Sequence, residues 1–486
     1  MKKTFTVILL IILVFSALFF LVPKNYLGTT IKKIVSWTFE TYKKAERWNS
    51  YEKDIVGIID EKLLIKDKDI IAYTNKLVFK ANEEIKLNLI GIDKVNIKVY
   101  QINRDGREVE IYSLSKDINI SPLAVFSSYE GVISPTEIIR LESKNLGSGW
   151  FEIQIKNTKD DIVNIPIFIN PDQINKKIVY VESTDTLMAY NYAYEVYKIP
   201  NHYKKTNTNS PSALVPHNMP IIYNQFGLNK SKEINCEDHL INSDMVQKVN
   251  LNKLGFDFQS ISDELLDDKN TLNNIDTLIF GTHNEYWTKS KAKNVINFIN
   301  DGGKVLFLGG NYAWRQVYRQ NDRTWLHGFG LMKDPIFNEL VINYIGTYYT
   351  PLDYQTYAGI KILDNKAMMK YLSIDVKENL LIGNGTRFDH CSKKILGVSG
   401  HETDKLTNIS NGFIQLAKGQ NPSSDSYTFA EITHLNQAQN KTLGADVIYK
   451  SFPSGGKILN FSSLSLWHNK DPIINRMIKN FIKNNN

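Results

Sequence analysis

Residues 277–308 of this chain, TLIFGTHNEYWTKSKAKNVINFINDGGKVLFL, contain the pattern that decides its fold. Two short strand-like runs, 277–281 and 305–308, flank a stretch in which apolar residues recur every three or four positions, as on one buried face of a helix. Thr288 suits the N-cap of that helix and Gly302 its carboxyl end. A strand, a helix and a strand of these lengths predict two parallel strands joined by a right-handed crossover. The apolar positions of the helix are Ala292, Val295, Ile296 and Ile299.

Polar side chains follow both of these strands. His283 and Glu285 come just after the turn that ends the first strand, and Asn311 follows the glycine pair 309–310 after the second. Side chains two positions apart in an extended segment point the same way, and ligands of open α/β sheets bind at the carboxyl edge. We therefore expect His283, Glu285 and Asn311 to share one site. The alternative is that His283 and Glu285 only cap the helix or pair on the surface, beside an ordinary glycine turn.

The alternation of strand-like and helix-like segments extends over residues 173–486 and predicts one α/β domain with a parallel sheet. Residues 71–172 instead show short alternating runs separated by turn residues, which is typical of an antiparallel β-sandwich. Residues 31–70 mix aromatic and charged side chains and are predicted to form a helical stalk. Residues 198–240, rich in Asn, Pro and Lys, are predicted to be a long irregular insertion.

Residues 1–30 contain an almost wholly apolar run, Thr4 to Val22, preceded by Lys2 and Lys3. About 20 apolar residues are enough to cross a bilayer, and the end of the run lacks the small-residue pattern of a cleavage site. We expect an uncleaved signal anchor with its amino end in the cytoplasm. The protein would then be single-pass in the inner (cell) membrane, with its later domains extracytoplasmic. If the span is cleaved, the protein is secreted.

Composition argues against several classes of protein. The 486 residues are 42% hydrophobic and 22% charged, which is typical of a folded globular chain. The net charge of +7 is not gathered into an arginine-rich stripe, so we expect no nucleic-acid binding. Cys236 and Cys391 lack metal-finger spacing, and both a single disulfide and two separate thiols stay open. No nucleophile elbow, HExxH motif or P-loop occurs in the sequence.

Four separated motifs resemble the large (β) subunit family of N,N-dimethylformamidase, over roughly residues 176–486. Their order along the chain and their spacing make the resemblance specific. The motifs are Ala189-Tyr190-Asn191; Leu254-Gly255-Phe256-Asp257 leading to Thr282-His283-Asn284-Glu285-Tyr286-Trp287; Gly309-Gly310-Asn311 with Trp314-Arg315; and Gly397-x-x-Gly400-His401-Glu402-x-Asp404, followed by Ser454-Gly455 through Trp467.

The resemblance implies a glutamine-amidotransferase-like α/β fold with a flavodoxin-like parallel sheet, preceded by an immunoglobulin-like module. It also implies a mononuclear ferric ion, Fe(3+), held by two tyrosines and one glutamate. Glu285 matches the glutamate and Tyr190 one tyrosine, and Tyr223 is our choice for the second. Such hard anionic donors suit a trivalent ion, which would polarise an amide carbonyl or activate water. The positions that match the family's acid–base and orienting residues are His283, Asn311 and Glu402.

We therefore expect a membrane-anchored amidohydrolase that cleaves the C–N bond of a small amide, either as a homo-oligomer or with a small partner subunit such as the family's enzyme has. The family often places Pro or a small residue between the His and the Glu, and a Trp-Gly pair after Ala-Tyr-Asn. Here Asn284 and Tyr192-Ala193 stand in those places, which leaves the identity of the amide open. The competing hypothesis is a non-catalytic envelope protein that reuses the fold to bind a carbohydrate or a peptide.

Overall fold

The structure is a computed structural model of the chain, and the residues it describes lie in one compact unit, Asp60–Asn486. The span predicted at residues 4–22 lies outside the described residues. Within the described ranges, no helix is both long and apolar enough to cross a membrane. The described ranges are 61–64, 70–102, 108–119, 123–127, 131–132, 137–143, 146–189, 212–216, 240–320, 323–327, 334–350, 357–385, 387–389, 394–400, 403–406, 412–421 and 444–484.

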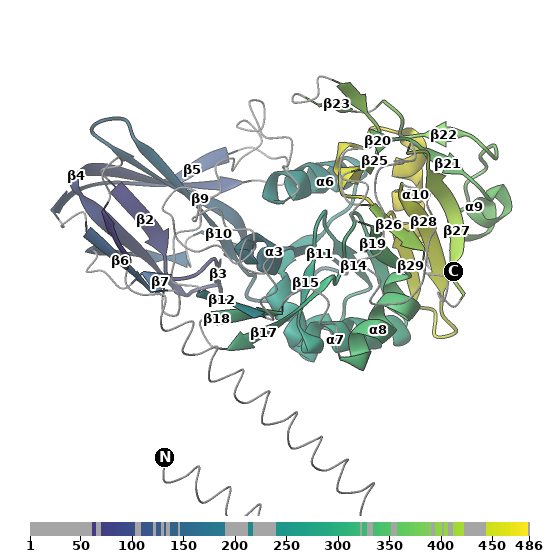
Figure 1. The fold of residues 1–486 in the computed structure, drawn as a ribbon, viewed down its shortest axis with the longest axis horizontal. Coiled ribbons are helices and arrows are strands. Elements are labelled where there is room, and N and C mark those ends of the chain that lie inside the picture. The colour runs from purple at the N-terminus through teal and green to yellow at the C-terminus, as the bar shows by residue number, and fades with distance from the viewer. Residues whose placement is uncertain are drawn as a thin grey trace, which may run out of the picture. The chain divides into compact units, whose positions relative to one another are not determined.

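The first part of this unit consists of largely antiparallel sheets in a sandwich-like arrangement (Figure 1). The long strand β4 (Glu84–Ile102) pairs with β2 and β8 through its first half and with β5 and β9 through its second half. Gly91, with a φ of 149°, lies where the partners change, in a conformation that glycine adopts readily. Its other strands are β2 (Ile70–Thr74), β3 (Val78–Phe79), β5 (Glu108–Asn119), β8 (Glu137–Glu142), β9 (Gly149–Asn157) and β10 (Ile162–Ile169).

A separate three-stranded sheet is formed by β1 (Glu61–Leu64), β6 (Leu123–Ser127) and β7 (Gly131–Val132). Strand β1 falls inside the segment 31–70 that was predicted to be a helical stalk, so the end of that segment is extended. The remainder of the predicted stalk, apart from Ile70 at the start of β2, lies outside the described residues.

The α/β domain is built on a nine-stranded sheet with the order β13-β11-β14-β16-β29-β28-β27-β21-β22. The first five strands are parallel, and in chain order they run 2-1-3-4-5, which is the flavodoxin-like arrangement. The last four strands extend the sheet in antiparallel fashion. The strands are β11 (Ile178–Glu182), β13 (Gln259–Ser262), β14 (Thr277–Phe280), β16 (Lys304–Phe307), β21 (Ile360–Ile362), β22 (Leu381–Ile382), β27 (Ile414–Gly419), β28 (Asp446–Ser451) and β29 (Lys457–Asn460).

Helices cover both faces of this sheet (Figure 1). One face packs against α6 (Ile241–Lys253), α9 (Asn365–Leu372) and α10 (Pro472–Lys483), through a core that includes Tyr180 and Ile279. The other packs against α7 (Lys289–Asn300), α8 (Pro335–Glu339) and the π-helical turn η5 (Leu340–Ile345), through a core that includes Val179 and Phe280. Because neighbouring residues of one strand enter opposite cores, the central strands are continuously apolar.

Shorter elements make up the other described sheets and turns of this domain. A four-stranded sheet has the order β12-β18-β17-β15, and three two-stranded sheets pair β19 with β26, β20 with β25 and β23 with β24. Their bounds are β12 (Ser212–Pro216), β15 (Tyr286–Trp287), β17 (Arg315–Gln320), β18 (Arg323–His327), β19 (Thr347–Thr350), β20 (Tyr357–Ala358), β23 (Arg387–Asp389), β24 (Lys394–Leu396), β25 (Ser399–Gly400) and β26 (Thr403–Leu406). The short helices are α3 (Thr184–Ala189), η3 (Asp263–Asp267), η4 (Lys269–Leu272) and η7 (Leu464–His468).

The predicted strand–helix–strand unit is confirmed. Strands β14 and β16 are parallel neighbours, and α7 lies between them in the sequence. The Thr288 side chain accepts a hydrogen bond from Lys291 N and so caps the helix as predicted, and Gly302 follows its end with a φ of 99°. The expected parallel α/β sheet is confirmed with it.

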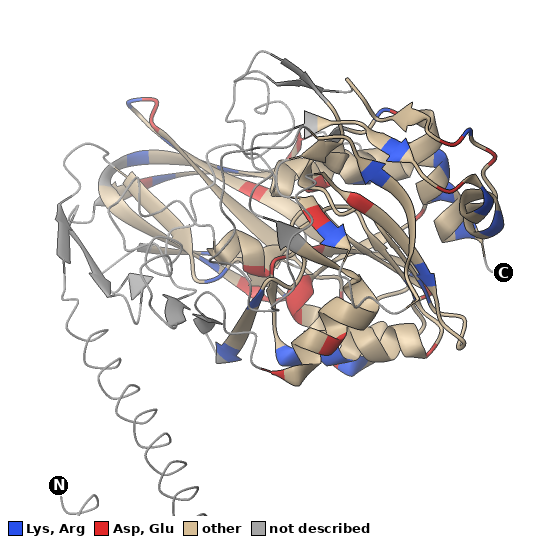
Figure 2. Cartoon of the chain, turned by 45° about the vertical axis from the view of Figure 1, so that its right-hand side comes forward, with Lys and Arg blue, Asp and Glu red and all other residues tan. Residues whose placement is uncertain are grey.

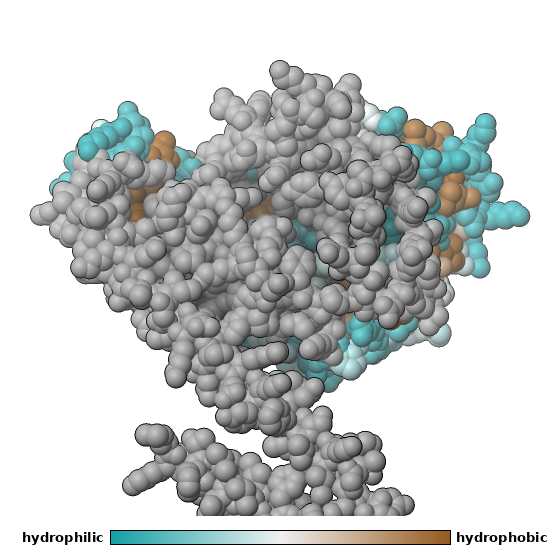
Figure 3. Space-filling model, in the orientation of Figure 1, coloured by the Kyte–Doolittle hydropathy of each residue, from teal (hydrophilic) through white to brown (hydrophobic). Residues whose placement is uncertain are grey.

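The antiparallel end of the sheet exposes apolar side chains, which appear as brown surface at the right of Figure 3, over β21, β22 and α9. The edge strand β22 is only two residues long. A short edge offers few unpaired backbone groups to another chain, which limits edge-to-edge association. The exposed residues are Leu363, Met369, Leu380 and Leu381.

Candidate functional site

The candidate site lies where the order of the parallel strands reverses. The chain passes from β11 to β13 on one side of it and then to β14 on the other, and ligands of such sheets bind outside the carboxyl ends at this switch point. The segments that leave β11 and β14 there are 183–189 and 281–287. The second contains His283 and Glu285, the residues that the sequence pattern singled out.

The loops after β14 and β16 are joined by three backbone hydrogen bonds. Gly310 N donates to Thr282 O at 3.3 Å, Ala313 N to Asn284 O at 3.1 Å, and Arg315 N to Glu285 O at 3.0 Å. The last of these belongs to the parallel pairing of β15 with β17. The two loops that carry His283, Glu285 and Asn311 therefore form one paired structure.

Glycine is required where these loops approach each other most closely. A Cβ added to Gly309 would lie 1.8 Å from the carbonyl oxygen of Thr282, which is backbone and has little freedom to move. A Cβ on Gly281 would lie 2.4 Å from Oδ1 of Asp244 on α6. The glycines that end these strands thus serve close packing at the sheet edge.

His283, Glu285 and Arg315 form a buried group of charged and polar side chains. His283 Nε2 lies 3.3 Å from Glu285 Oε2, and Arg315 Nε lies 3.1 Å from Glu285 Oε1. The three side chains are at most 3% exposed. Glu285 therefore presents one oxygen to a cation and the other to an imidazole that can accept or donate a proton.

Asn311 is held in a left-handed backbone conformation by an acidic residue from a distant strand. Its φ is 54°, and its backbone N–H donates to both carboxylate oxygens of Asp404, at 2.9 and 3.0 Å. Asp404 N in turn donates to the carbonyl oxygen of Ser462, another left-handed residue, just after β29. Three strand ends are tied together in this way, and Asn311 is placed by residues far away in the sequence.

The segment after β11 reaches the same edge. Thr186 Oγ1, on α3, accepts a hydrogen bond from Glu285 N at 3.1 Å. The Asn284 side chain, which lies between the two predicted site residues, donates from Nδ2 to Ser183 Oγ at 3.3 Å and to Asp263 Oδ2 at 3.4 Å. Segments from β11, β13 and β14 therefore meet around residues 283–285.

A second group of buried charged side chains contacts the 281–287 segment through Lys291, and sequence reasoning did not find it. Lys291 of α7 is fully buried and donates to Asp263 at 2.9 Å, to Asp185 at 3.3 Å and to the carbonyl oxygen of Tyr286 at 2.9 Å. Arg319 also bonds to Asp185. Burial pushes the pKa of Asp185 up, but the charges of Arg319 and Lys291 bring it below its usual value. Figure 2 shows acidic and basic segments together in the middle of the molecule.

A third acidic group lies on the opposite face of the sheet. Asp244 of α6 accepts a hydrogen bond from Thr282 N at 2.7 Å through Oδ1. Burial, and then the charge of Glu182, raise the pKa of Asp244 to about 7. A carboxyl group that titrates near neutral pH thus contacts the residue next to His283.

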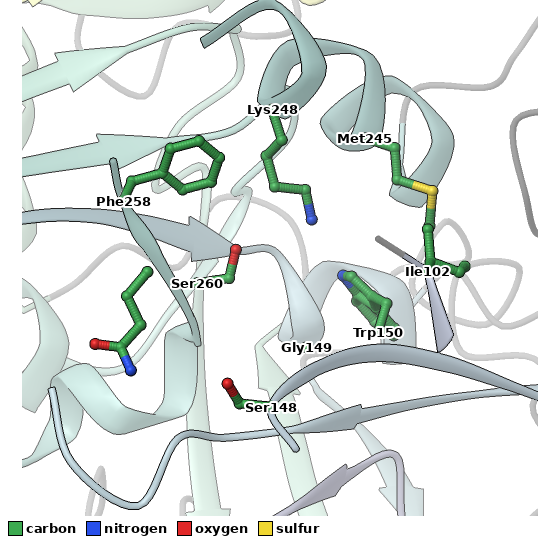
Figure 4. A pocket seen from close by; sticks show the side chains of 9 residues that line it. Ile102, Ser148, Gly149, Trp150, Met245, Lys248, Phe258 and Ser260 are labelled. Carbon is green, nitrogen blue, oxygen red and sulfur yellow. The ribbon is translucent and has the colours of Figure 1, made fainter. Parts of the chain in front are cut away.

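One cavity of about 120 Å³ lies close to this third group (Figure 4). Lys248 points into it, and its ammonium bonds to Glu182 Oε1 at 2.6 Å. Trp150 of β9 forms another wall and donates from Nε1 to Glu182 Oε2 at 2.9 Å. The cavity is therefore separate from the His283–Glu285 pair, and its lining comes from both the sandwich and the α/β domain. The remaining lining residues are Ile102, Ser148, Gly149, Met245, Phe258, Gln259 and Ser260.

Three of the six predicted site residues, Tyr190, Tyr223 and Glu402, lie outside the described residues, as do Cys236 and Cys391. In the described part of the chain, no three His, Cys, Asp or Glu side chains converge as metal ligands would. Glu285 fits the part of a ferric ligand in its chemistry, because a glutamate side chain is a hard oxygen donor, and Arg315 lies 3.1 Å from it. The other two proposed donors are phenols, so the described residues supply one ligand of the proposed three.

Comparison with known proteins places the chain. A family model described as N,N-dimethylformamidase beta subunit-like, C-terminal, matches residues 138–467. The chain belongs to this family. The match includes all six predicted site residues and begins in β8 of the sandwich, ahead of the α/β domain. No curated protein matches the chain significantly.

Similarities to solved structures are more limited. A ThuA-like protein from Bacteroides uniformis is 13% identical, with a TM-score of 0.31, and the match covers 52% of this chain and 86% of that one. The N-terminal domain of mmIFT52 is 12% identical, with a TM-score of 0.26, 48% of this chain and 81% of that one being covered. A β-glucosidase from Listeria innocua in complex with gluconolactone is 8% identical, with a TM-score of 0.16, and the match spans 23% of this chain and only 16% of that protein. The dimethylformamidase-like family match therefore carries the assignment.

Proposed function

We propose that this protein is an amidohydrolase that cleaves the C–N bond of a small amide at the carboxyl edge of β11, β14 and β16. Membership of the dimethylformamidase-like family supports the reaction class. The observation that supports the proposal is the backbone pairing of the 281–287 and 308–315 loops, which carry His283, Glu285 and Asn311, together with the buried His283–Glu285 pair. Buried side chains on two paired loops suit the orientation of a small substrate.

In this proposal Glu285 would hold a ferric ion together with Tyr190 and Tyr223, and Thr186, four residues before Tyr190, already bonds to the backbone of Glu285. When bound, such an ion supplies Lewis acidity toward the amide carbonyl. His283, 3.3 Å from Glu285, would take a proton from the attacking water or return one to the leaving amine. Asn311 would orient the carbonyl oxygen, and Glu402 is our second candidate for proton transfer.

The remaining parts of the proposal concern the cellular location and the oligomeric state of the enzyme. We place it in the cell membrane through residues 4–22, with the α/β domain outside the cytoplasm. Membrane fractionation with and without residues 1–30 tests this, since a shortened chain should move to the soluble fraction. Size measurement of the purified protein tests for a homo-oligomer or a small partner subunit.

The decisive experiment measures iron and amide hydrolysis in the same preparation of the full chain. We expect about one iron per chain, a visible tyrosinate-to-iron absorption, and release of amine from a panel of small amides. Glu285→Gln should lose the iron and the activity, and His283→Gln should keep the iron while the turnover falls by about 10²- to 10⁴-fold. Glu152→Gln, at a buried glutamate in the sandwich, is the matched control and should change neither.

Other outcomes would count against the proposal. A folded wild-type chain that neither takes up iron nor hydrolyses any amide of the panel would favour the non-catalytic carbohydrate- or peptide-binding hypothesis. If Glu285→Gln and Tyr190→Phe both retain the iron of the wild type, the metal site lies elsewhere.

A further inference from the structure

We propose that Arg315 is a positioning residue of this site: it fixes the carboxylate of Glu285 through one oxygen, so that the other oxygen is directed at His283. The position follows the Gly309-Gly310-Asn311 motif in the sequence. The chemical purpose of the arrangement rests on the proposed function, whereas the contact between Arg315 and Glu285 does not.

Arg315 is attached to Glu285 at two levels. Its backbone N–H donates to the carbonyl oxygen of Glu285 at 3.0 Å, in the pairing of β15 with β17. Its side-chain Nε lies 3.1 Å from Glu285 Oε1. A backbone hydrogen bond and an ion pair therefore join the same two residues.

The guanidinium is also held from a second direction. Its central carbon lies 5.8 Å from the centroid of the Tyr286 ring, within the range of a cation–π contact. Arg315 is 4% exposed, and a planar guanidinium can stack on a ring and bond to a carboxylate at the same time, which an ammonium does less well. Arg315 therefore has both a carboxylate and an aromatic ring within contact range.

The consequence for Glu285 is that its two oxygens are not equivalent. Oε1 faces Arg315 and Oε2 lies 3.3 Å from His283 Nε2. A ligand ion or a transferred proton would therefore meet Glu285 through Oε2, next to the imidazole. Carboxylate ligands of metals are commonly oriented by such neighbours, and loss of the neighbour weakens metal binding by about 10- to 100-fold.

The first test measures the iron affinity of the full-length protein by competition with a chelator, and follows the fold by circular dichroism. Arg315→Met should weaken iron binding at least about 10-fold, and Arg315→Lys should recover only part of the loss. Lys304→Met is the matched control, because Lys304 is a buried cation at the amino end of β16 and bonds to the carbonyl oxygen of Ile482. It should leave the iron affinity unchanged. Equal iron affinity in Arg315→Met and the wild type would overturn the inference while leaving the proposed function intact.

A second test needs no metal. The unfolding midpoints of metal-free Arg315→Met, Glu285→Gln and the double variant form a double-mutant cycle. We expect clear non-additivity. The midpoint of the double variant should fall by less than the sum of the decreases in the two single variants. Strict additivity would overturn the inference even if iron binds. A wild type without iron would refute the metal part of the proposed function, and the cycle would still decide whether Arg315 holds Glu285.

Discussion

At the scale of single residues, Asp244 shows how the fold places an acidic group where its charge is poorly solvated. Its carboxyl group is 2% exposed and accepts a hydrogen bond from Thr282 N. Burial and the charge of Glu182 raise its pKa from 3.8 to about 7. Because the pKa of Asp244 is higher in the folded than in the unfolded chain, protonation of this carboxyl group stabilises the fold. The stabilisation is complete below about pH 4 and is lost as the pH rises through about 7.

Asp244→Asn should therefore remove a pH-dependent loss of stability. Below about pH 4 the difference in free energy of unfolding between the variant and the wild type should not change with pH. Between about pH 4 and 7 the free energy of unfolding of the wild type should fall relative to that of the variant. Each unit of pKa shift corresponds to about 1.4 kcal/mol. Chemical denaturation at a series of pH values checks this. A stability difference that does not change with pH would show that Asp244 ionises normally in the fold.

Sequence reasoning at this scale succeeded where the pattern is local. His283 and Glu285 are two positions apart in an extended segment, which predicted that they face one site, and they lie 3.3 Å apart. Asp404 and Arg315 were present in the motifs but received no role. Asp404 acts on a backbone N–H 93 residues away, and such a contact depends on how distant strands are brought together.

At the scale of elements, α7 both packs on the sheet and supports its carboxyl edge. Its apolar face is buried against β11, β14 and β16. The ammonium of Lys291, which lies next to that face, donates a hydrogen bond to the carbonyl oxygen of Tyr286 in the 283–287 loop. The ammonium is the shared partner of Asp185 and Asp263. Removal of one partner from a buried ionic group leaves the other charges uncompensated.

Lys291→Met should destabilise the protein by about 3–5 kcal/mol, because Asp185 and Asp263 would lose a buried partner. Lys289→Met, two positions earlier on the same helix, removes a cation whose side chain is 60% exposed and should have little effect. Urea denaturation of the two variants makes the comparison. Similar unfolding midpoints for both would show that the buried group does not contribute as the geometry indicates.

The elements themselves were predictable to different degrees. The unit from β14 to β16 combines a strand run, a capped amphipathic helix and a second strand run, and its local pattern gave its bounds to within a residue. The antiparallel extension β28-β27-β21-β22 was not predicted as part of the sheet. Its pairing joins segments that are distant in sequence, and a register shift between Gln415 and Ala417 interrupts the alternation that would mark β27 as a strand.

At the scale of the whole molecule, one buried carboxylate links the sandwich to the α/β domain. Glu182, at the end of β11, accepts hydrogen bonds from Trp150 of β9 and from Lys248 of α6. Another buried bond runs from Asn170 Nδ2 to Ser262 Oγ at 2.9 Å. The two parts therefore share polar contacts that are shielded from water.

Trp150→Phe should destabilise the protein by about 1–3 kcal/mol, since Glu182 loses a hydrogen-bond donor in a buried position. The expected signature is that the same substitution costs less in a Glu182→Gln background, where the charge that needs the donor is gone. Thermal unfolding of the four proteins measures this. An equal cost in both backgrounds would mean that Trp150 contributes only through packing.

The shared carboxylate has a consequence for how the gene can be divided. A fragment that begins at Pro171 would contain every strand of the nine-stranded sheet. In that fragment Glu182 would keep the hydrogen bond from Lys248 but lose the one that the Trp150 indole donates to its Oε2. The family match likewise starts upstream of that boundary, at residue 138. The last sandwich strands therefore belong to the buried surroundings of Glu182, and a division at Pro171 would remove the Trp150 donor while Lys248 stayed as the partner of the carboxylate.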